Sequence, residues 1–169
     1  MKVLYLLRHA KSSWEDAGLA DHDRPLTPRG KRAAAAIADH LRREGIQPAL
    51  VLCSTARRAR DTVKPLRRVL SDQAEVRFES ALYAASSGEL LGRLRSVAEP
   101  VPSVMLVGHN PGLQELGLRL AHPSARRDAL ERRFPTGALA ILEMDVASWR
   151  NVAEGPGELT SLILPRELG

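Results

Sequence analysis

The sequence predicts an α/β fold in which helices pack against a central sheet. Three apolar segments, at residues 3–7, 49–53 and 103–107, have the length and composition of buried strands. Helical patterns lie between these segments, and this alternation is typical of layered α/β proteins. The sequence contains no repeat, low-complexity tract or linker, and 169 residues can bury a sizeable core. We therefore expect a single domain over residues 1–169.

Helix boundaries in the first half of the chain follow from capping and proline signals. Thr27 is a favourable N-cap, Pro28 suits the first turn that follows it, and Gly45 can end that helix. The next helix is expected over residues 56–70. Pro65 lies inside it and is expected to kink or divide it, because proline removes a backbone donor.

The second half of the chain continues the alternation and closes with two strands. Ser86 and Ser87 are cap candidates for one of its helices, and the closing strands are joined through Trp149 and the loop 155–157. The expected elements are a weak strand at 76–78, a helix at 88–98, a helix that starts at Pro111 with Asn110 as its cap, and strands at 138–144 and 159–164.

The amino-acid composition indicates the cellular compartment and the kinds of partner that we expect. Cys53 is the only cysteine, so no intramolecular disulfide can form, and no segment has the pattern of a secretion signal or a membrane span. We expect a cytoplasmic protein with no membrane partner. The net charge of +5 is compatible with nucleic-acid binding, but the aromatic residues are scattered and form no stacking platform. We therefore expect no specific nucleic-acid partner.

Two histidines and several arginines follow the predicted buried strands. Arg8 and His9 end the first strand, Arg57 and Arg58 lie in the first turns of the helix after the second, and His109 follows the third. Open α/β sheets bind ligands at the carboxyl ends of their strands, beside helix N-termini that favour anions. Arginine matches phosphate oxygens bidentately. The pattern predicts a phosphoryl-binding site.

Other chemistries fit the sequence less well. Arginines flank both histidines and would repel a cation, and no HExxH motif or carboxylate cluster occurs, so no metal site is expected. A cysteine phosphatase would need an arginine after Cys53 with five residues between the two, and this chain has Ala59 at that position. Cys53 is instead expected to be a small buried residue. The remaining histidines are interpreted as surface or structural residues: His22, His40 and His122.

Three motifs resemble those of the histidine phosphatase superfamily, which has the phosphoglycerate-mutase-like fold. They are Leu7-Arg8-His9-Ala10, the segment STARRARDT at 54–62, and Gly108-His109-Asn110-Pro111. The resemblance implies a three-layer structure, with a mostly parallel central sheet and helices on both faces. It also selects Arg58 rather than Arg57 for the pocket. Thr55 and Ala56 depart from the family pattern and are expected to alter loop shape more than chemistry.

The resemblance is closest to the SixA-like phosphohistidine phosphatases. Arg24-Pro25-Leu26-Thr27 followed by Gly30 is similar to a segment of that branch in which the arginine faces the phosphate. The segment 134–142 looks like its late strand, and the chain is short, without the insertions of the mutases. The likeness spans nearly the whole chain, although it is dense only at the motifs.

The family implies a role for each motif residue. His9 would attack phosphorus as a neutral nucleophile, while Arg8, Arg58 and His109 hold the phosphoryl oxygens. A second group, Arg24 and Asn110, would complete the phosphate site. No metal and no cofactor are implied. The protonation state of His109 is left open, because a charge would help binding but burial among arginines opposes it.

The expected substrate class follows from the lack of a clear general acid in the sequence. Phosphomonoester-cleaving relatives carry a glutamate that protonates the leaving group, and Glu79 is a weak candidate for it here. A phosphohistidine-bearing protein needs such an acid less, because protonated imidazole leaves readily, and phosphate would be the product. One alternative is a phosphatase for a small phosphorylated substrate, either a phosphomonoester or a nucleotide. The other is a non-catalytic phosphoprotein-binding module.

Overall fold

A six-stranded sheet forms the centre of the part of the chain that the computed structural model describes, residues 1–152 and 157–168. Gly155 and Pro156 of the predicted closing loop lie outside the described residues. The strands are β1 (Lys2–Arg8), β2 (Leu50–Ser54), β3 (Glu75–Glu79), β4 (Ser103–Gly108), β5 (Leu139–Met144) and β6 (Gly157–Ile163).

The sheet is mostly parallel, as the sequence predicts. Its strand order is β3-β2-β4-β1-β5-β6. The pairs β3–β2, β2–β4 and β4–β1 are parallel, whereas β5 runs antiparallel to β1 and β6 antiparallel to β5. The carboxyl ends of β1, β2 and β4 therefore meet at one edge, where the predicted site residues follow them.

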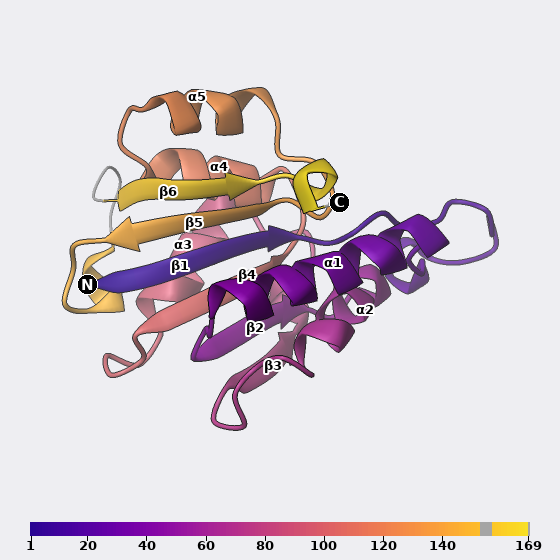
Figure 1. Cartoon of the computed structure of the whole chain (residues 1–169), viewed down its shortest axis with the longest axis horizontal. Helices are drawn as coiled ribbons and strands as arrows, with labels where there is room; N and C mark the ends of the chain where they lie inside the picture. Colours follow the sequence, from indigo (N-terminus) through magenta and orange to yellow (C-terminus); the bar gives the residue numbers. More distant parts are fainter. Residues whose placement is uncertain (153–156, 169) are drawn as a thin grey trace.

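Helices cover both faces of the sheet (Figure 1), which confirms the three-layer prediction. Helices α1 and α2 pack on one face, and α3 and α4 pack on the other. Helix α5 lies against α4 and β6, and the sequence signals did not predict it. The helices are α1 (Pro28–Glu44), α2 (Arg57–Leu66), α3 (Ser87–Arg95), α4 (Gly112–Leu120) and α5 (Ala125–Arg132), with short 3-10 turns η1 (Asp21–Asp23), η2 (Ser80–Leu82), η3 (Trp149–Asn151) and η4 (Pro165–Leu168). None of the described helices has the length and hydropathy needed to cross a bilayer.

Alternation along the central strands divides the core into two apolar layers. Leu4 and Leu6 of β1 face the α3–α4 side, while Leu7 faces α1 and α2 together with Met105 of β4. Each of these side chains is almost fully buried. Burial of one such side chain contributes about 1.5–3 kcal/mol, so the strand ends that carry the site are held by a rigid core.

Predicted helix boundaries are confirmed within one turn, with two corrections. The Thr27 side chain accepts a hydrogen bond from the N–H of Gly30, and Gly45 ends α1 at a φ of 64°. Helix α2 stops at Leu66 rather than at residue 70, and Pro65, which has no N–H to donate, lies in its last turn. Helix α4 begins at Gly112, one residue later than expected.

Gly30 fixes the loop that precedes α1. A side chain there would collide with the backbone carbonyl of Lys11. The same carbonyl accepts a hydrogen bond of 2.9 Å from the N–H of Thr27. The loop after β1 therefore packs directly against the start of α1, and this contact places Arg24 beside the sheet edge.

Candidate active site

One pocket at the carboxyl edge of the sheet brings together all the site residues that the sequence predicts. Its volume is about 370 Å³. Its walls come from the ends of β1 and β4, the start of α2 and the loop before α1. The residues that line it are Arg8, His9, Lys11, Ser12, Trp14, Asp21, Arg24, Arg58, His109, Asn110 and Thr136.

His9 is held as a neutral imidazole with a defined tautomer. It is 6% exposed, and its Nδ1 lies 2.7 Å from the carbonyl oxygen of Ala10. A carbonyl only accepts, so Nδ1 carries the hydrogen and Nε2 keeps its lone pair. Burial lowers the pKa of His9 to about 3. The hydrogen bond to the Ala10 carbonyl opposes this shift, whereas the charges of His109, Arg58 and Arg8 add to it. The only hydrogen bond of the His9 ring among the described residues is the one at Nδ1, so Nε2 is available as a nucleophile.

Thr62 links the backbone after His9 to helix α2, which carries Arg58. Its Oγ1 accepts a hydrogen bond of 3.0 Å from the N–H of Ala10 and donates one of 2.7 Å to the carbonyl of Arg58. Thr62 is fully buried. The backbone immediately after His9 is therefore fixed relative to the first turns of α2.

His109 faces His9, with ring centroids 5.2 Å apart. Its Nε2 lies 2.8 Å from Ser54 Oγ, and its Nδ1 lies 3.5 Å from a guanidinium nitrogen of Arg58. Guanidinium can only donate, so we assign the hydrogen to Nε2 and the acceptor to Nδ1. Burial and Arg58 lower the pKa of His109 to about 4, against the opposing charge of Asp21. His109 is therefore neutral near pH 7 in the free protein.

Arg8 and Arg58 line the pocket, and each is held by a backbone carbonyl. Arg8 donates to the carbonyl of Phe134 at 3.1 Å, and Arg58 donates to the carbonyl of Asp21 at 2.7 Å. The Nε atom of each guanidinium is buried, and neither Nε has a hydrogen-bond partner in the described part of the chain. A buried N–H without an acceptor costs about 1–3 kcal/mol.

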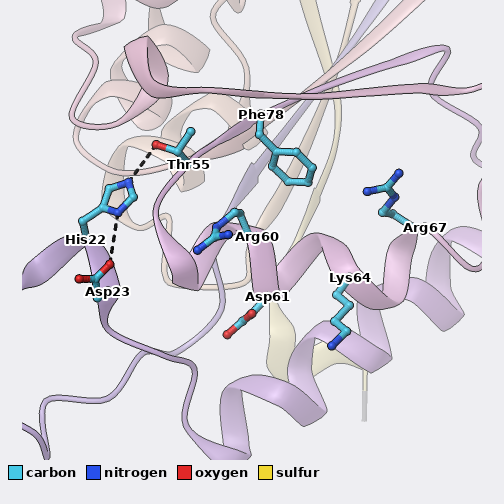
Figure 2. A pocket seen from close by; sticks show the side chains of 8 residues that line it. All are labelled: His22, Asp23, Thr55, Arg60, Asp61, Lys64, Arg67 and Phe78. Carbon is cyan, nitrogen blue, oxygen red and sulfur yellow. Dashed lines mark hydrogen bonds and ion pairs between the residues drawn. The ribbon is translucent and has the colours of Figure 1, made fainter. Parts of the chain in front are cut away.

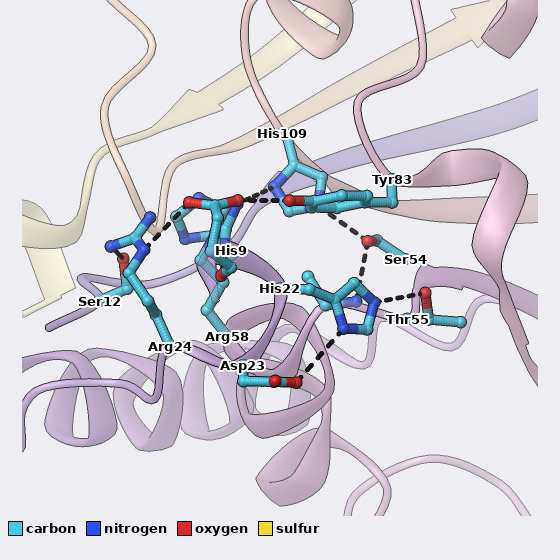
Figure 3. A network of polar contacts seen from close by, with 12 residues as sticks. His9, Ser12, His22, Asp23, Arg24, Ser54, Thr55, Arg58, Tyr83 and His109 are labelled. Atoms are coloured by element: carbon cyan, nitrogen blue, oxygen red, sulfur yellow. Dashed lines mark hydrogen bonds and ion pairs between the residues drawn. The ribbon is translucent and has the colours of Figure 1, made fainter. Parts of the chain in front are cut away.

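Asp21 organises the arginines, and sequence reasoning missed it. Its carboxylate accepts from Arg24 and Arg58, at 3.1 Å each, and from the hydroxyl of Tyr83. Hydrogen bonds from Tyr83 and the two arginines lower the pKa of Asp21 to about 2, so it is ionised. Figure 3 shows Arg24, Arg58 and Tyr83 converging in this network. No local signal links Asp21 to Arg58 and Tyr83, which are far away in sequence.

Arg24 is fixed from several sides. It donates to Ser12 Oγ at 2.9 Å and to the carbonyl of Ser13 at 3.3 Å. The Trp14 ring, which is 74% exposed, covers it with 3.5 Å between ring centroid and guanidinium carbon. This cation–π contact adds to the hydrogen bonds that hold Arg24 in the pocket wall.

Asn110 lines the pocket, but its amide is engaged with the protein. Its N–H groups donate to the carbonyl of Phe134 at 2.9 Å and to Gln114 Oε1 at 3.3 Å, and its Oδ1 accepts from the N–H of Gln114. The Phe134 carbonyl is also the acceptor for Arg8. Asn110 therefore fixes the segment that anchors Arg8.

Residues 4–111, which include the three motifs, match the sequence profile of the histidine phosphatase superfamily, branch 1. The chain belongs to this superfamily. An uncharacterised protein of Mycobacterium tuberculosis is 36% identical over 164 residues, which cover 95% of this chain and 100% of that protein.

Two similar solved structures are of proteins provisionally named phosphohistidine phosphatase SixA. The Nakamurella multipartitia protein has a TM-score of 0.83 and 34% identity, with 97% of this chain and 96% of that chain covered. The Agrobacterium tumefaciens protein has a TM-score of 0.83 and 32% identity, with 97% and 98% covered. These likenesses place the chain in the SixA-like branch, and its superfamily indicates phosphatase activity.

Other candidate groups lie apart from this histidine phosphatase pocket. Glu79 forms a bidentate ion pair with Arg93, with N···O distances of 2.7 and 2.9 Å, and this pairing lowers the pKa of Glu79. Burial raises the pKa of the Cys53 thiol, so it is an inert core residue. Arg57 lies 3.6 Å from Asp61 on the exposed side of α2. No group of three or more His, Cys, Asp or Glu side chains in the described ranges is arranged to hold a metal ion.

His22 lies closer to the site than the sequence suggests. Its ring meets Tyr83 edge-on at 4.9 Å, and Tyr83 in turn meets His109 at 5.5 Å. Its Nε2 is 2.9 Å from Thr55 Oγ1 (Figure 3). His22 is therefore part of the wall beside the pocket, whereas the sequence indicated only a surface or structural residue.

Proposed function

We propose that the protein is a phosphohistidine phosphatase that works through a covalent phospho-His9 intermediate. The observation that carries this proposal is the tautomer of His9: the Ala10 carbonyl holds the hydrogen on Nδ1, and Nε2 is free among cationic donors. A histidine held in this way can attack phosphorus without first losing a proton.

The phosphoryl group is bound by the side chains that surround His9. The guanidinium groups of Arg8 and Arg58 bind two of its oxygens, and Arg24, which also lines the pocket, binds beside them. These donors are fixed before substrate arrives, so they stabilise the charge that develops during transfer. Asn110 acts as a positioning residue through the Phe134 carbonyl. We infer that these cations act without a metal ion.

The reaction has two displacement steps. His9 Nε2 forms a bond to phosphorus, the P–N bond of the substrate breaks, and the departing imidazole keeps the electron pair of that bond. Water then attacks phospho-His9, its proton passes to solvent, and inorganic phosphate and free His9 remain. An imidazole that arrives protonated leaves as a neutral group. Neither step requires Glu79, which is held ionised by Arg93 outside the pocket.

Similar proteins support this substrate class. Both provisionally assigned SixA structures cover nearly the whole chain at 34% and 32% identity. The pocket of about 370 Å³ can accept a phosphoryl group and an imidazole ring presented by another protein.

A substrate series tests the proposal. We expect kcat/KM to be highest for phosphohistidine peptides and phosphoramidate, lower for aryl phosphates and lowest for alkyl phosphates. A preference for an alkyl phosphate would indicate the small-molecule phosphatase instead. Binding of phosphopeptide without turnover, and with no phosphoenzyme after alkaline quench, would indicate the binding module.

A further inference from the structure

A second and larger hollow lies beside the catalytic pocket, and the proposed chemistry does not use it. Its volume is about 560 Å³. Helix α2 forms one wall, β3 contributes Phe78, and His22 and Thr55 line the end nearest the catalytic pocket (Figure 2). We call this hollow the α2–β3 groove.

Three cations line the groove on one face of α2. Arg60, Lys64 and Arg67 are spaced four and three residues apart, so they lie on the same side of the helix and its C-cap. All three are exposed, and none has an ion pair among the described residues. We call these residues the basic stripe.

Two carboxylates, Asp61 and Asp23, also line the groove and are outnumbered by its three cations. Asp61 lies 3.6 Å from Arg57, and Asp23 lies 3.6 Å from a ring nitrogen of His22. The stripe therefore keeps an excess of positive charge facing the groove. An anionic partner would complement it.

Phe78 gives the groove an apolar surface. It is 39% exposed on β3, and the Arg67 guanidinium lies 6.0 Å from its ring centroid. Figure 2 shows the ring facing the side chains of α2 across the groove. Positive charge beside an exposed aromatic ring suits a peptide segment that combines acidic and apolar side chains.

The groove is continuous with the wall of the catalytic pocket. His22, at one end of the groove, contacts Tyr83, which contacts His109. Thr55 directly follows Ser54, the hydrogen-bond partner of His109. A protein that inserts a phosphorylated side chain into the pocket would also lie over the groove.

We propose that the α2–β3 groove docks an acidic segment of the phosphohistidine-bearing substrate protein, with the basic stripe as its recognition element. This inference rests on the proposed function. From Arg60 to Arg67 the stripe is about 10 Å long, at about 1.5 Å per helical residue. About three residues of an extended segment span that distance.

Synthetic phosphohistidine peptides test the docking surface. Two peptides are identical except that one carries aspartates beside the histidine and the other carries asparagines at those positions. We expect wild-type kcat/KM to be about tenfold higher for the acidic peptide at low ionic strength, and this preference to shrink as salt screens it. The combined variant Arg60→Glu, Lys64→Glu and Arg67→Glu should lose or reverse the preference and hydrolyse phosphoramidate at the wild-type rate.

A matched control changes the net charge equally at exposed arginines outside the groove: Arg43→Glu, Arg126→Glu and Arg150→Glu. It should keep the preference for the acidic peptide. The milder variant Arg60→Gln, Lys64→Gln and Arg67→Gln should weaken the preference, and it provides the test if the reversed-charge protein does not fold.

The outcomes separate the docking inference from the proposed function. If the wild type shows no preference, or the stripe variants keep it, the docking inference is wrong and the proposed function stands. The same holds if the control variant loses the preference. If phosphoramidate is hydrolysed but neither phosphohistidine peptide is, both the proposed function and the docking inference are wrong.

Discussion

Two arginines on helix α2, only two residues apart, lie in opposite environments. Arg58 points into the catalytic pocket, is 6% exposed and is held by Asp21. Arg60 points into the α2–β3 groove, is exposed and has no ion pair among the described residues. The helix therefore separates a fixed, dehydrated cation from a solvated one.

The contrast between Arg58 and Arg60 shows why arginines in different environments are expected to contribute differently to catalysis and to substrate recognition. Interaction of unit charges weakens as the effective dielectric rises, and salt screens exposed charges further. A buried guanidinium that is already oriented can stabilise a developing charge without reorganisation. Mutations in the pocket should therefore change chemistry strongly, whereas mutations in the groove should change substrate preference moderately.

The largest expected effect is that of removing the nucleophile. His9→Ala should lower turnover at least about ten-thousand-fold, because the covalent route is lost. In the wild type, label from a radioactive substrate should survive alkaline quench and be lost in acid, and in the variant it should be absent. Acid-stable label on a serine would contradict the assignment, and thermal unfolding checks that the variant is folded.

The pair Arg58→Ala and Arg60→Ala tests the contrast directly. Loss of Arg58 should lower kcat/KM for phosphoramidate by about a hundred- to a thousandfold, as expected for one fixed donor to the transferring group. Loss of Arg60 should change it less than about twofold, because the exposed charge is screened. Equal losses would show that the two environments do not differ in function.

Asp21→Asn should distinguish the effect of positioning Arg24 and Arg58 from the effect of the net charge of the pocket. Without the carboxylate, Arg24 and Arg58 lose the anchor that they share, so kcat should fall by up to about a hundredfold, the effect of misplacing a group by about 1 Å. The pocket also becomes more positive, so the inhibition constant of inorganic phosphate should decrease. Tyr83→Phe keeps the carboxylate and should change both values less. A parallel loss of kcat and phosphate binding would contradict this division of roles.

Stability should depend on pH through the buried histidines. The pKa of His9 is lowered to about 3 and that of His109 to about 4, against an unfolded value near 6.5. Between these values the unfolded state binds more protons, so stability falls as pH decreases from about 6.5 towards 4. His9→Gln should flatten the wild-type dependence by about 1 kcal/mol per pH unit between about pH 6 and pH 5. Urea unfolding at both pH values measures this, and an unchanged slope would mean that His9 is not held neutral.

Glu79→Gln should have the smallest effect on catalysis. Glu79 is bound to Arg93 away from the pocket, so phosphohistidine hydrolysis should change less than about threefold, well below the loss of a general acid. The broken ion pair should cost about 1 kcal/mol or less, and Arg93→Gln should cost a similar amount. A hundredfold loss of activity in Glu79→Gln alone would restore Glu79 as the acid.

The sequence by itself determined the layered fold and the histidines and arginines that meet in the pocket. Apolar runs of strand length specify buried parallel strands, and the residues that follow such strands must meet at one edge of the sheet. This reasoning, with the family motifs, identified Arg8, His9, Arg58 and His109. Capping chemistry is also local, so Thr27 marked the start of α1 correctly.

Only the tertiary structure decided how these groups are held and what lies beside them. Asp21, Tyr83 and Ser54 come from separate elements, and the short-range patterns around them give no sign that they meet Arg58 and His109. Helix α5 has a weak apolar face and forms by packing against α4 and β6. The groove likewise exists because β3 pairs with β2 and places Phe78 opposite the basic stripe. Contacts between distant segments depend on chain topology, and the periodicity of the sequence does not predict them.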